Sequence, residues 1–224
     1  MTVPALTTDQ MREVDRIMID DLGVALIQMM ENAGRNLAWL AVERFSPATV
    51  TVLAGPGGNG GGGLAAARHL ANRGIGVTAT LVKPVEEMAG ISAHQAGILQ
   101  RMGVVFEEEP QPADLTIDAV LGYSLQGDPR GRAADLIRWA NGQPAVVSLD
   151  TPSGLDTATG RVGDPCVRAN ATMTLALPKT GLRKAPGMVG DLYLADISVP
   201  PPVYEAFGLK VGDLFAAGPV VPIS

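Results

Sequence analysis

The chain opens with two amphipathic segments. Thr7 is followed three residues later by Gln10, a spacing typical of a capping box, and helical periodicity continues to Asp20. We therefore expect a helix over residues 7–20. A second helix is expected over residues 25–44, where apolar side chains recur at intervals of three and four residues: Ile27, Met30, Ala33, Leu37, Leu40 and Ala41.

From residue 49 onward, short apolar and β-branched runs alternate with helical stretches. This alternation predicts an α/β fold whose parallel sheet is covered by helices on both faces. A Gly/Pro-rich loop replaces the helix between the last two strands, so we expect these strands to close the sheet differently and the tail from residue 200 to pack irregularly. The predicted strands are residues 49–54, 77–82, 104–106, 115–121, 145–149, 171–176 and 191–197, and the predicted helices between the earlier ones are residues 64–73, 92–102 and 132–141.

Length and composition favour one folded domain over residues 1–224. Hydrophobic residues make up 46% of the chain, enough for a continuous core and too many for an intrinsically disordered protein. A formal charge of -6, only 4% aromatic residues and the lack of a Lys/Arg cluster argue against nucleic-acid binding. The acidic start resembles no secretory leader and no apolar run is long enough to span a membrane, so we expect a cytoplasmic protein.

The sequence contains few of the residues that serve as nucleophile or base in Ser/His/Asp and Cys/His enzymes. Cys166 is the only cysteine, too few for a disulfide or a zinc cluster, and we interpret it as a small buried hydrophobe. His69 and His94 lie in helical patterns, and neither is placed as a catalytic base for the cysteine or for a serine. The sequence therefore does not indicate a Ser/His/Asp or Cys/His mechanism.

The excess of glycine is local, because seven of the nine residues from 55 to 63 are glycine. This run follows a predicted strand and leads into a helix expected to begin near Leu64, where backbone amides and the helix dipole favour an anion. The alternative is a sharp strand-to-helix turn that only needs positive φ. A Walker A loop is excluded, because Leu64 and Ala65 stand where Lys and Ser/Thr are required.

The dinucleotide pattern GxGxxG is also present, at Gly55, Gly57 and Gly60. A dinucleotide-binding dehydrogenase needs an acidic residue after the next strand to bind the ribose, and Lys83 stands there instead. Without that acid and without a recognisable substrate domain, a hydride-transferring dehydrogenase is the weaker interpretation.

Polar residues follow the later strands. Asp118 lies inside or at the end of one predicted strand, and Asp150 ends the next and is followed shortly by Ser153. Open α/β sheets bind ligands at this edge, where Asn59 also lies. Two unpaired carboxylates brought together there need a cation or a raised pKa. A cation held by Asn59, Asp118 and Ser153 would leave Asp150 free to meet a substrate; alternatively, these acids are separate caps or turn residues.

Two further segments carry charge near the same edge. The loop at residues 122–131 combines glycines and hydroxyls and would form a second phosphate site with Arg130 or Arg132, or else an ordinary surface loop. Lys179 and Lys184 flank another loop, where either would balance a phosphate or point into solvent. The acidic run Glu107, Glu108 and Glu109 is interpreted as a solvated loop.

Several motifs together resemble the YjeF N-terminal family, the NAD(P)H-hydrate epimerases. The resemblance runs through nearly the whole chain in order, which makes it far more specific than one glycine-rich loop. Its motifs are Gln10, Met11, Arg12 and Asp15, then residues 30–34 (MENAG), the glycine run 55–63, residues 118–125, residues 149–156 (LDTPSGLD), and Pro178, Lys179 and Gly181.

This resemblance implies a Rossmann-like three-layer α/β/α sandwich with a mostly parallel sheet and two N-terminal helices. It implies epimerisation of the R and S hydrates of NADH and NADPH, a homodimer, and a separate hydrate dehydratase as pathway partner. One potassium ion per subunit would be held by Asn59, Asp118 and Ser153. The dinucleotide would contact Gly58, Asn59, Gly60, Gly61, Gly62, Gly122, Tyr123, Ser124, Leu125, Gln126, Gly127, Asp128 and Asp150.

The hydrate chemistry needs a group that moves a proton at the hydroxyl-bearing carbon. Asp150 is the candidate acid or base. The chain departs from the family pattern where Gly58 replaces an asparagine, where Gly62 replaces an aspartate, and where residues 122–125 (GYSL) replace a GTGL element. Loss of the carboxylate at position 62 leaves a second hypothesis open, a divergent or non-catalytic nucleotide-binding module.

Overall fold

A sheet of eight strands runs through the centre of the protein, as seen in a computed structural model that describes residues 3–223. The strand order is β3-β2-β1-β4-β5-β6-β7-β8, and every pairing is parallel except that of β7 with β8. The strands are β1 (Thr49–Ala54), β2 (Gly76–Leu81), β3 (Val105–Phe106), β4 (Leu115–Ala119), β5 (Val146–Leu149), β6 (Ala171–Leu175), β7 (Asp191–Ala195) and β8 (Val220–Pro222). Strand order reverses between β1 and β4, the position at which open α/β sheets form ligand crevices.

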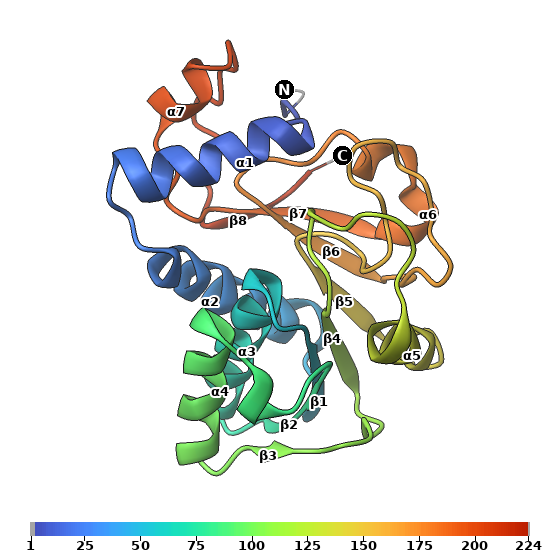
Figure 1. Cartoon of the computed structure of the whole chain (residues 1–224). Helices are drawn as coiled ribbons and strands as arrows, with labels where there is room; N and C mark the ends of the chain where they lie inside the picture. The colour runs from blue at the N-terminus through green and yellow to red at the C-terminus, as the bar shows by residue number, and fades with distance from the viewer. Residues whose placement is uncertain (1–2, 224) are drawn as a thin grey trace.

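Helices cover both faces of this sheet, which confirms the predicted three-layer α/β/α fold with two N-terminal helices. Helices α2 (Leu26–Phe45), α3 (Gly58–Ala71) and α4 (Gly90–Arg101) lie on one face, and α5 (Gly131–Ala140) and α6 (Pro186–Val189) on the other (Figure 1). Helix α1 (Thr8–Arg16), which continues as a π-helical turn at Ile17–Asp21, and α7 (Pro201–Glu205) lie toward one end of the molecule. Short 3₁₀ turns occur at Val85–Glu87 and Leu182–Lys184.

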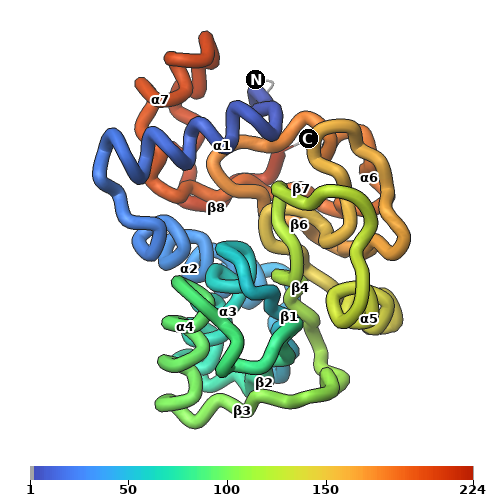
Figure 2. Tube along the Cα trace, in the orientation of Figure 1, coloured from blue at the N-terminus to red at the C-terminus, as the bar shows by residue number. Residues whose placement is uncertain are grey.

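The start of α1 is fixed by local and long-range hydrogen bonds. The predicted capping box is confirmed: the Gln10 amide donates to the Thr7 hydroxyl at 3.2 Å, and the Thr7 amide donates to the Gln10 side chain at 2.9 Å. Just before it, the Leu6 amide donates to the Pro178 carbonyl and the Thr180 amide to the Leu6 carbonyl. Figure 2 shows α1 beside this segment after β6, so the N-terminal helix is tied to the carboxyl edge of the sheet.

The glycine run is helical, and the prediction that the helix begins near Leu64 was wrong. Residues 58–63 form the first turns of α3, although glycine costs about 1 kcal/mol per residue in a helix relative to alanine. The reason is close packing. A Cβ atom at Gly60 would lie 1.8 Å from the Gly55 carbonyl oxygen, and one at Gly63 would lie 2.3 Å from Cβ of Ala119. Tertiary contact therefore overrides intrinsic helix propensity here.

The C-terminal part of the fold differs from the prediction in two ways. The β6–β7 pair is parallel like the preceding β5–β6 pair, and the connection between β6 and β7 contains α6. The tail does not pack irregularly throughout: it forms α7, whose Tyr204 is buried, and then β8, whose Val220 and Val221 are buried against β7. The antiparallel strand at this edge comes from the tail, which the proline-rich composition concealed.

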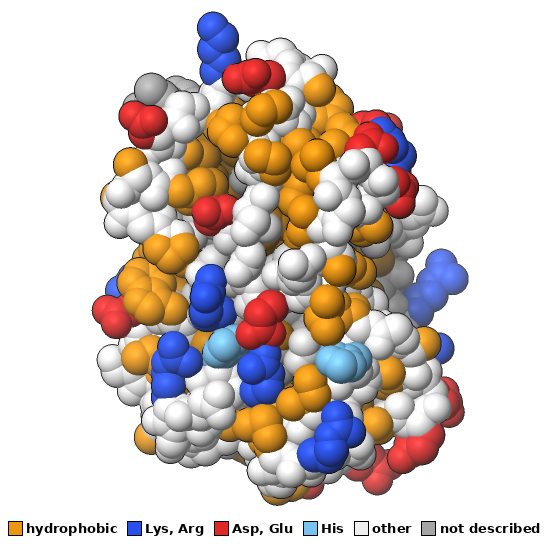
Figure 3. Space-filling model, turned by 90° about the vertical axis from the view of Figure 1, so that its left-hand side faces the viewer, with side chains coloured by type: hydrophobic (Ala, Val, Ile, Leu, Met, Phe, Trp, Pro, Cys, Tyr) orange, Lys and Arg blue, Asp and Glu red, His pale blue; other side chains and the backbone are white. Residues whose placement is uncertain are grey.

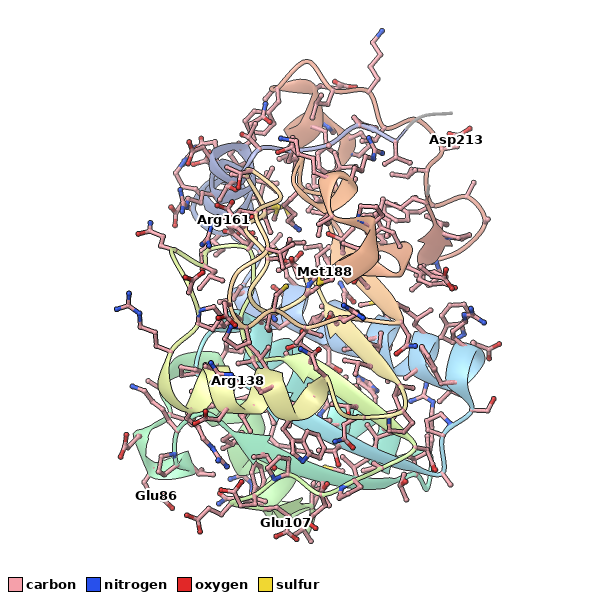
Figure 4. The ribbon with its side chains drawn as sticks, turned by 90° about the vertical axis from the view of Figure 1, so that its right-hand side faces the viewer. Glu86, Glu107, Arg138, Arg161, Met188 and Asp213 are labelled. Atoms are coloured by element: carbon pink, nitrogen blue, oxygen red, sulfur yellow. The ribbon has the colours of Figure 1, made fainter. Side chains whose placement is uncertain are left out.

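Other expectations concern single residues. Cys166 is buried as predicted, and burial raises the pKa of its thiol to about 12. The partner of His69 is Glu31, which its ring contacts at 2.8 Å between α3 and α2. Glu107 projects from the edge of the sheet beyond β3 (Figure 4), and Glu108 and Glu109 are exposed. Within residues 3–223 no helix combines the length and apolar character that crossing a membrane requires.

Candidate active site

A cavity of about 410 Å³ opens at the carboxyl ends of β1, β4, β5 and β6. It therefore lies at the point where strand order reverses. Its walls come from α1 and the turn that follows it, the start of α2, the turn into α3, the loop after β4, the ends of β5 and β6, and Ile197 after β7. The residues that give it chemical character are Asp15, Asn59, Tyr123, Ser124, Asp150 and Lys179.

Asp150 reaches this cavity from a strained turn at the end of β5. Its φ is +66°, and the Thr151 amide donates to the Leu149 carbonyl at 2.8 Å across it. An L-residue with a side chain rarely adopts this backbone conformation, which costs of order 1–3 kcal/mol and persists where surrounding contacts over-determine it. The turn places a carboxylate that is only 4% exposed at the cavity wall.

The partner of Asp150 is Lys179, which is fully buried. Its ammonium donates to Oδ1 of Asp150 and, at 3.0 Å, to the Leu175 carbonyl, and it lies 5.8 Å from the centre of the Tyr123 ring. The solvent-exposed alternative for Lys179 is thus wrong, whereas Lys184 is exposed. Asp150 is also not an unpaired carboxylate, because the chain supplies its counter-charge.

Sequence reasoning did not assign a role to Asp15, which lies on α1 and faces the same cavity. The Tyr123 hydroxyl donates to Oδ2 of Asp15 at 2.6 Å. Burial raises the pKa of Asp15, opposed by this hydrogen bond and by the positive charge of Lys179. The available signal was helical register, since Asp15 follows Met11 by four residues and Met11 belongs to the buried face of α1.

Asp118, Ser153 and Asn59 form a connected polar group below the cavity. Asp118 is fully buried and accepts hydrogen bonds from the Ser148 hydroxyl at 2.7 Å and from the amide and hydroxyl of Ser153 at 2.9 and 2.5 Å. The Leu121 amide donates to the Ser153 hydroxyl at 2.8 Å, and the side-chain amide of Asn59 donates to the Leu121 carbonyl at 3.0 Å. The structure thus brings these three predicted residues together.

The oxygen atoms that this polar group offers as ligands suit a hard monovalent cation. Within residues 3–223 no lysine, arginine or histidine lies within ion-pair distance of Asp118, and burial raises the pKa of its carboxyl group. A fully buried carboxylate without a counter-charge is costly. The surrounding atoms are carboxylate, hydroxyl, amide and carbonyl oxygens, and no group of three His, Cys, Asp or Glu side chains is found in the described chain. The residues therefore fit potassium better than a transition metal.

The remaining predicted contact residues are spread around the cavity. Gly58 and Gly122 line it, whereas Leu125, Gln126 and Gly127 line a neighbouring hollow of about 420 Å³ that shares Tyr123 with it.

The other predicted residues lie farther from the cavity. Asp128 pairs with Arg161 at 2.7 Å on the surface, where Figure 4 shows Arg161 above α5. Arg132 pairs with Glu109 at 3.0 Å, and Arg130 is exposed at the start of α5. Gly60, Gly61 and Gly62 are buried where α3 packs against neighbouring segments, and they do not line the cavity.

Comparison with known proteins agrees with this geometry. A family model described as YjeF-related protein N-terminus matches residues 26–181. The chain belongs to the YjeF N-terminal family. The matched region contains Asn59, Asp118, Asp150, Ser153 and Lys179 but ends before β7, and it begins after Asp15.

Curated members of the YjeF N-terminal family cover most of the chain. An NAD(P)H-hydrate epimerase from Dehalogenimonas lykanthroporepellens is 45% identical over 93% of this chain and 87% of the relative. One from Rhodopirellula baltica is 33% identical over 93% of this chain and 90% of the relative. A bifunctional NAD(P)H-hydrate repair enzyme from Salinibacter ruber is 35% identical over 93% of this chain, which spans only 43% of that longer protein.

A solved member of the fold superposes over almost the whole chain. The crystal structure of a yeast protein, YNL200c, matches 99% of this chain and 100% of its own with a TM-score of 0.84. Sequence identity is only 21%, so this likeness supports the fold alone.

Proposed function

We propose that this protein interconverts the R and S epimers of hydrated NADH and NADPH. The observation that carries the proposal is the meeting of Asp150, Lys179 and the Asn59 turn around one cavity at the switch point of the sheet, in a chain whose family relatives are named for this activity. A cavity of this kind, mostly apolar with a few converging polar groups, is the usual form of a small-molecule site.

The reaction needs little more than control of one proton and of a developing positive charge. The carbon that bears the hydroxyl is bonded to the ring nitrogen, whose lone pair expels the hydroxyl as water when the oxygen is protonated. The resulting iminium takes water back on either face. Asp150 lies where its carboxyl group exchanges a proton with the leaving hydroxyl or the entering water and stabilises the cation, and Lys179 holds it in place.

The hydrated ring fits the cavity at Asp150, and the rest of the dinucleotide follows the loop after β4. Tyr123 borders both the cavity and the hollow formed with Leu125, Gln126 and Gly127, so this loop offers a continuous path. The first turn of α3 presents backbone amides at Gly58 and Asn59 to a phosphate at the cavity mouth.

Potassium is part of the proposal, with one ion per subunit held by Asn59, Asp118 and Ser153. When bound, the ion supplies positive charge beside the cavity and balances the buried Asp118 carboxylate. The chain's own residues then have separate tasks: Asn59 links the α3 turn to the loop after β4, and Ser153 links that loop to Asp118.

Two partners belong to the same proposal. The longer relative, a bifunctional NAD(P)H-hydrate repair enzyme, supports a hydrate dehydratase as the partner that acts on the same substrates. A homodimer is supported by an apolar patch at the elbow between α1 and α2, where large side chains are exposed (Figure 3): Ile19, Leu22, Leu26 and Ile27, with exposed fractions of 38%, 50%, 37% and 38%. Light scattering of the wild type against Leu22→Glu tests it, since a dimer through this patch becomes a monomer.

The predicted cytoplasmic location also belongs to this proposal. Its support is chemical: the lone Cys166 is a buried free thiol, so the fold needs no disulfide and no oxidising compartment.

The direct test incubates the purified protein with the separated R and S hydrates, with and without potassium. The epimerase accelerates equilibration of both, and Asp150→Asn abolishes the acceleration. No acceleration by the wild type, together with tight adenine-dinucleotide binding, would instead establish the non-catalytic module suggested by Gly62. The cavity favours the enzyme, because the missing carboxylate at position 62 leaves Asp15 and Asp150 in place.

A further inference from the structure

Inversion at the hydroxyl-bearing carbon makes a demand that Asp150 alone does not meet. The hydroxyl leaves as water from one face of the ring, and water must arrive on the other face to give the opposite epimer. A proton-transfer group works only within hydrogen-bond reach, about 3 Å, of the oxygen that it serves. An epimerase cavity therefore needs a proton-transfer group on each face.

The cavity contains a second carboxyl group with a free oxygen. Within residues 3–223, Asp15 accepts a hydrogen bond only at Oδ2, from Tyr123. Asp150 accepts hydrogen bonds from Lys179 and, at 3.4 Å, from the Leu175 amide, both at Oδ1. Each residue therefore keeps one carboxyl oxygen for a ligand, and the two approach the cavity from different elements, α1 and the end of β5.

We propose that Asp15 is a second catalytic residue, and that Asp15 and Asp150 transfer protons on opposite faces of the hydrated ring. This inference rests on the proposed epimerase function. It assigns to α1 a chemical task in addition to covering the cavity.

The step balances with water as the only co-reactant. Protonated Asp15 donates its proton to the hydroxyl oxygen; the C–O bond breaks with its electron pair on oxygen, and the nitrogen lone pair forms the C=N bond. Water then attacks the same carbon from the other face, the C=N π electrons return to nitrogen, and ionised Asp150 accepts the proton released from that water. In the reverse direction the two residues exchange roles, and solvent re-equilibrates the proton between them.

The surroundings of the two carboxyl groups favour a state in which Asp15 is protonated and Asp150 is ionised. Asp150 contacts the buried ammonium of Lys179, which stabilises a carboxylate. The groups that act on Asp15 from other elements are Tyr123, Lys179 and Asp150. Burial raises the pKa of Asp15 against the opposing influence of the Tyr123 hydrogen bond, so Asp15 holds its proton to higher pH than an exposed aspartate. The buried ion pair of Asp150 with Lys179 suits the base, and the neutral hydroxyl partner of Asp15 leaves it suited to the acid.

Oxygen exchange separates the two faces. We would incubate each pure epimer in H₂¹⁸O with the wild type, Asp15→Asn, Asp150→Asn, and Glu13→Gln as an exposed control on α1, and subtract the exchange seen without protein. We expect Asp15→Asn to lose 10²- to 10³-fold in kcat for epimerisation with little change in KM, because a general acid contributes about this factor. It should still incorporate ¹⁸O, with retention, into the one epimer whose hydroxyl faces Asp150.

The mirror result is expected for Asp150→Asn, with retention exchange confined to the other epimer, and Glu13→Gln should match the wild type. Loss of exchange in both epimers in step with epimerisation would make Asp15 merely structural and overturn the proposal, as would unchanged kcat in Asp15→Asn. An inactive wild type would instead defeat the epimerase function itself, so the two failures are distinguishable.

Tyr123→Phe gives an independent test if Asp15→Asn fails to fold. Removing the hydroxyl removes a hydrogen bond that favours ionised Asp15, so the pKa of Asp15 rises. Activity lost by deprotonation of the acid should then persist to higher pH, and the alkaline limb of the pH profile should move upward. An alkaline limb that stays in place or moves downward would overturn the role of Asp15 as the acid.

Discussion

Asp118 and Asp150 stand at the ends of adjacent strands, and both are nearly sealed from solvent, yet their charges are handled in opposite ways. Asp150 contacts the ammonium of the fully buried Lys179. Asp118 contacts only neutral donors: two serine hydroxyls and two backbone amides. The charge of Asp150 is therefore balanced by a lysine of the same chain, whereas the charge of Asp118 would have to be balanced by a bound cation.

This difference explains how a single edge of the sheet can serve two tasks. A carboxylate balanced by its own lysine is ready for substrate whether or not an ion is present. A carboxylate that is hydrogen-bonded but unbalanced attracts a cation, because desolvation penalises its charged form. The comparison yields four predictions, each of which tests a difference between the surroundings of Asp118 and those of Asp150.

Removal of Lys179 should have the largest effect. Lys179→Met leaves Asp150 buried without its partner, which typically costs about 3–5 kcal/mol in the free energy of unfolding. Urea denaturation measures it, with Lys184→Met as an exposed control expected to change stability by less than about 0.5 kcal/mol. Adding Asp150→Leu to Lys179→Met should recover much of the loss, since apolar replacement of both partners is often neutral. Equal, small effects of both single variants would show that the pair is not a buried one.

Potassium should distinguish the two carboxylates directly. At a hundredfold excess over its Kd the ion should stabilise the wild type by about 2.7 kcal/mol relative to tetramethylammonium at equal ionic strength. Asp118→Asn should lose this increment, because the charge that attracts the ion is gone, while Asp150→Asn should retain it. Thermal unfolding in the two salts provides the measurement. The comparison fails if Asp150→Asn loses the increment and Asp118→Asn keeps it.

Sequence patterns were sufficient for the frame that carries these two residues. The strand at residues 49–54 and the capping box at Thr7 follow from short-range chemistry, and both are found as predicted. The convergence of Asn59, Asp118 and Ser153 also follows from a general rule, that parallel strands present their carboxyl ends at one edge. These features need no knowledge of which distant residues are in contact.

Features that depend on distant contacts were not predictable in the same way. Lys179 lies 29 residues after Asp150, and nothing local distinguishes it from the exposed Lys184. The helical glycines of α3 contradict glycine's propensity, and only the closeness of the sheet and α2 explains them. The role of Asp15 required the same long-range knowledge, because Tyr123, its partner, lies 108 residues away.

Gly62, where the chain departs from the family pattern, packs next to the residue that precedes Asp150, so substitutions there test the surroundings of Asp150. A Cβ atom there would lie 2.8 Å from Cδ2 of Leu149, the residue before Asp150. Gly62→Ala should therefore destabilise the protein by about 1 kcal/mol, because overpacking costs about 2 kcal/mol and alanine regains about 1 kcal/mol of helix propensity, and Gly62→Asp should cost more. With Gly62→Ala as the matched control, epimerase assays should show no gain from the added carboxylate. A marked rise in activity for Gly62→Asp alone would show that the cavity lacks a group that the wild type needs.

The hydroxyl donors around the two carboxylates should give the smallest and most selective difference. Ser148 donates to Asp118 at 2.7 Å, so Ser148→Ala should cost about 1.5 kcal/mol, the lower end for a hydrogen bond to a charged group. The Thr174 hydroxyl lies 3.4 Å from the Lys179 ammonium, which keeps two better acceptors, so Thr174→Val loses only a weak contact and should cost less than Ser148→Ala. Because an ion at Asp118 takes over part of the stabilisation of its charge, the cost of Ser148→Ala should shrink in saturating potassium while that of Thr174→Val stays constant. Paired denaturation curves in the two salts measure both costs. Equal dependence on potassium for the two variants would mean that the ion does not act at Asp118.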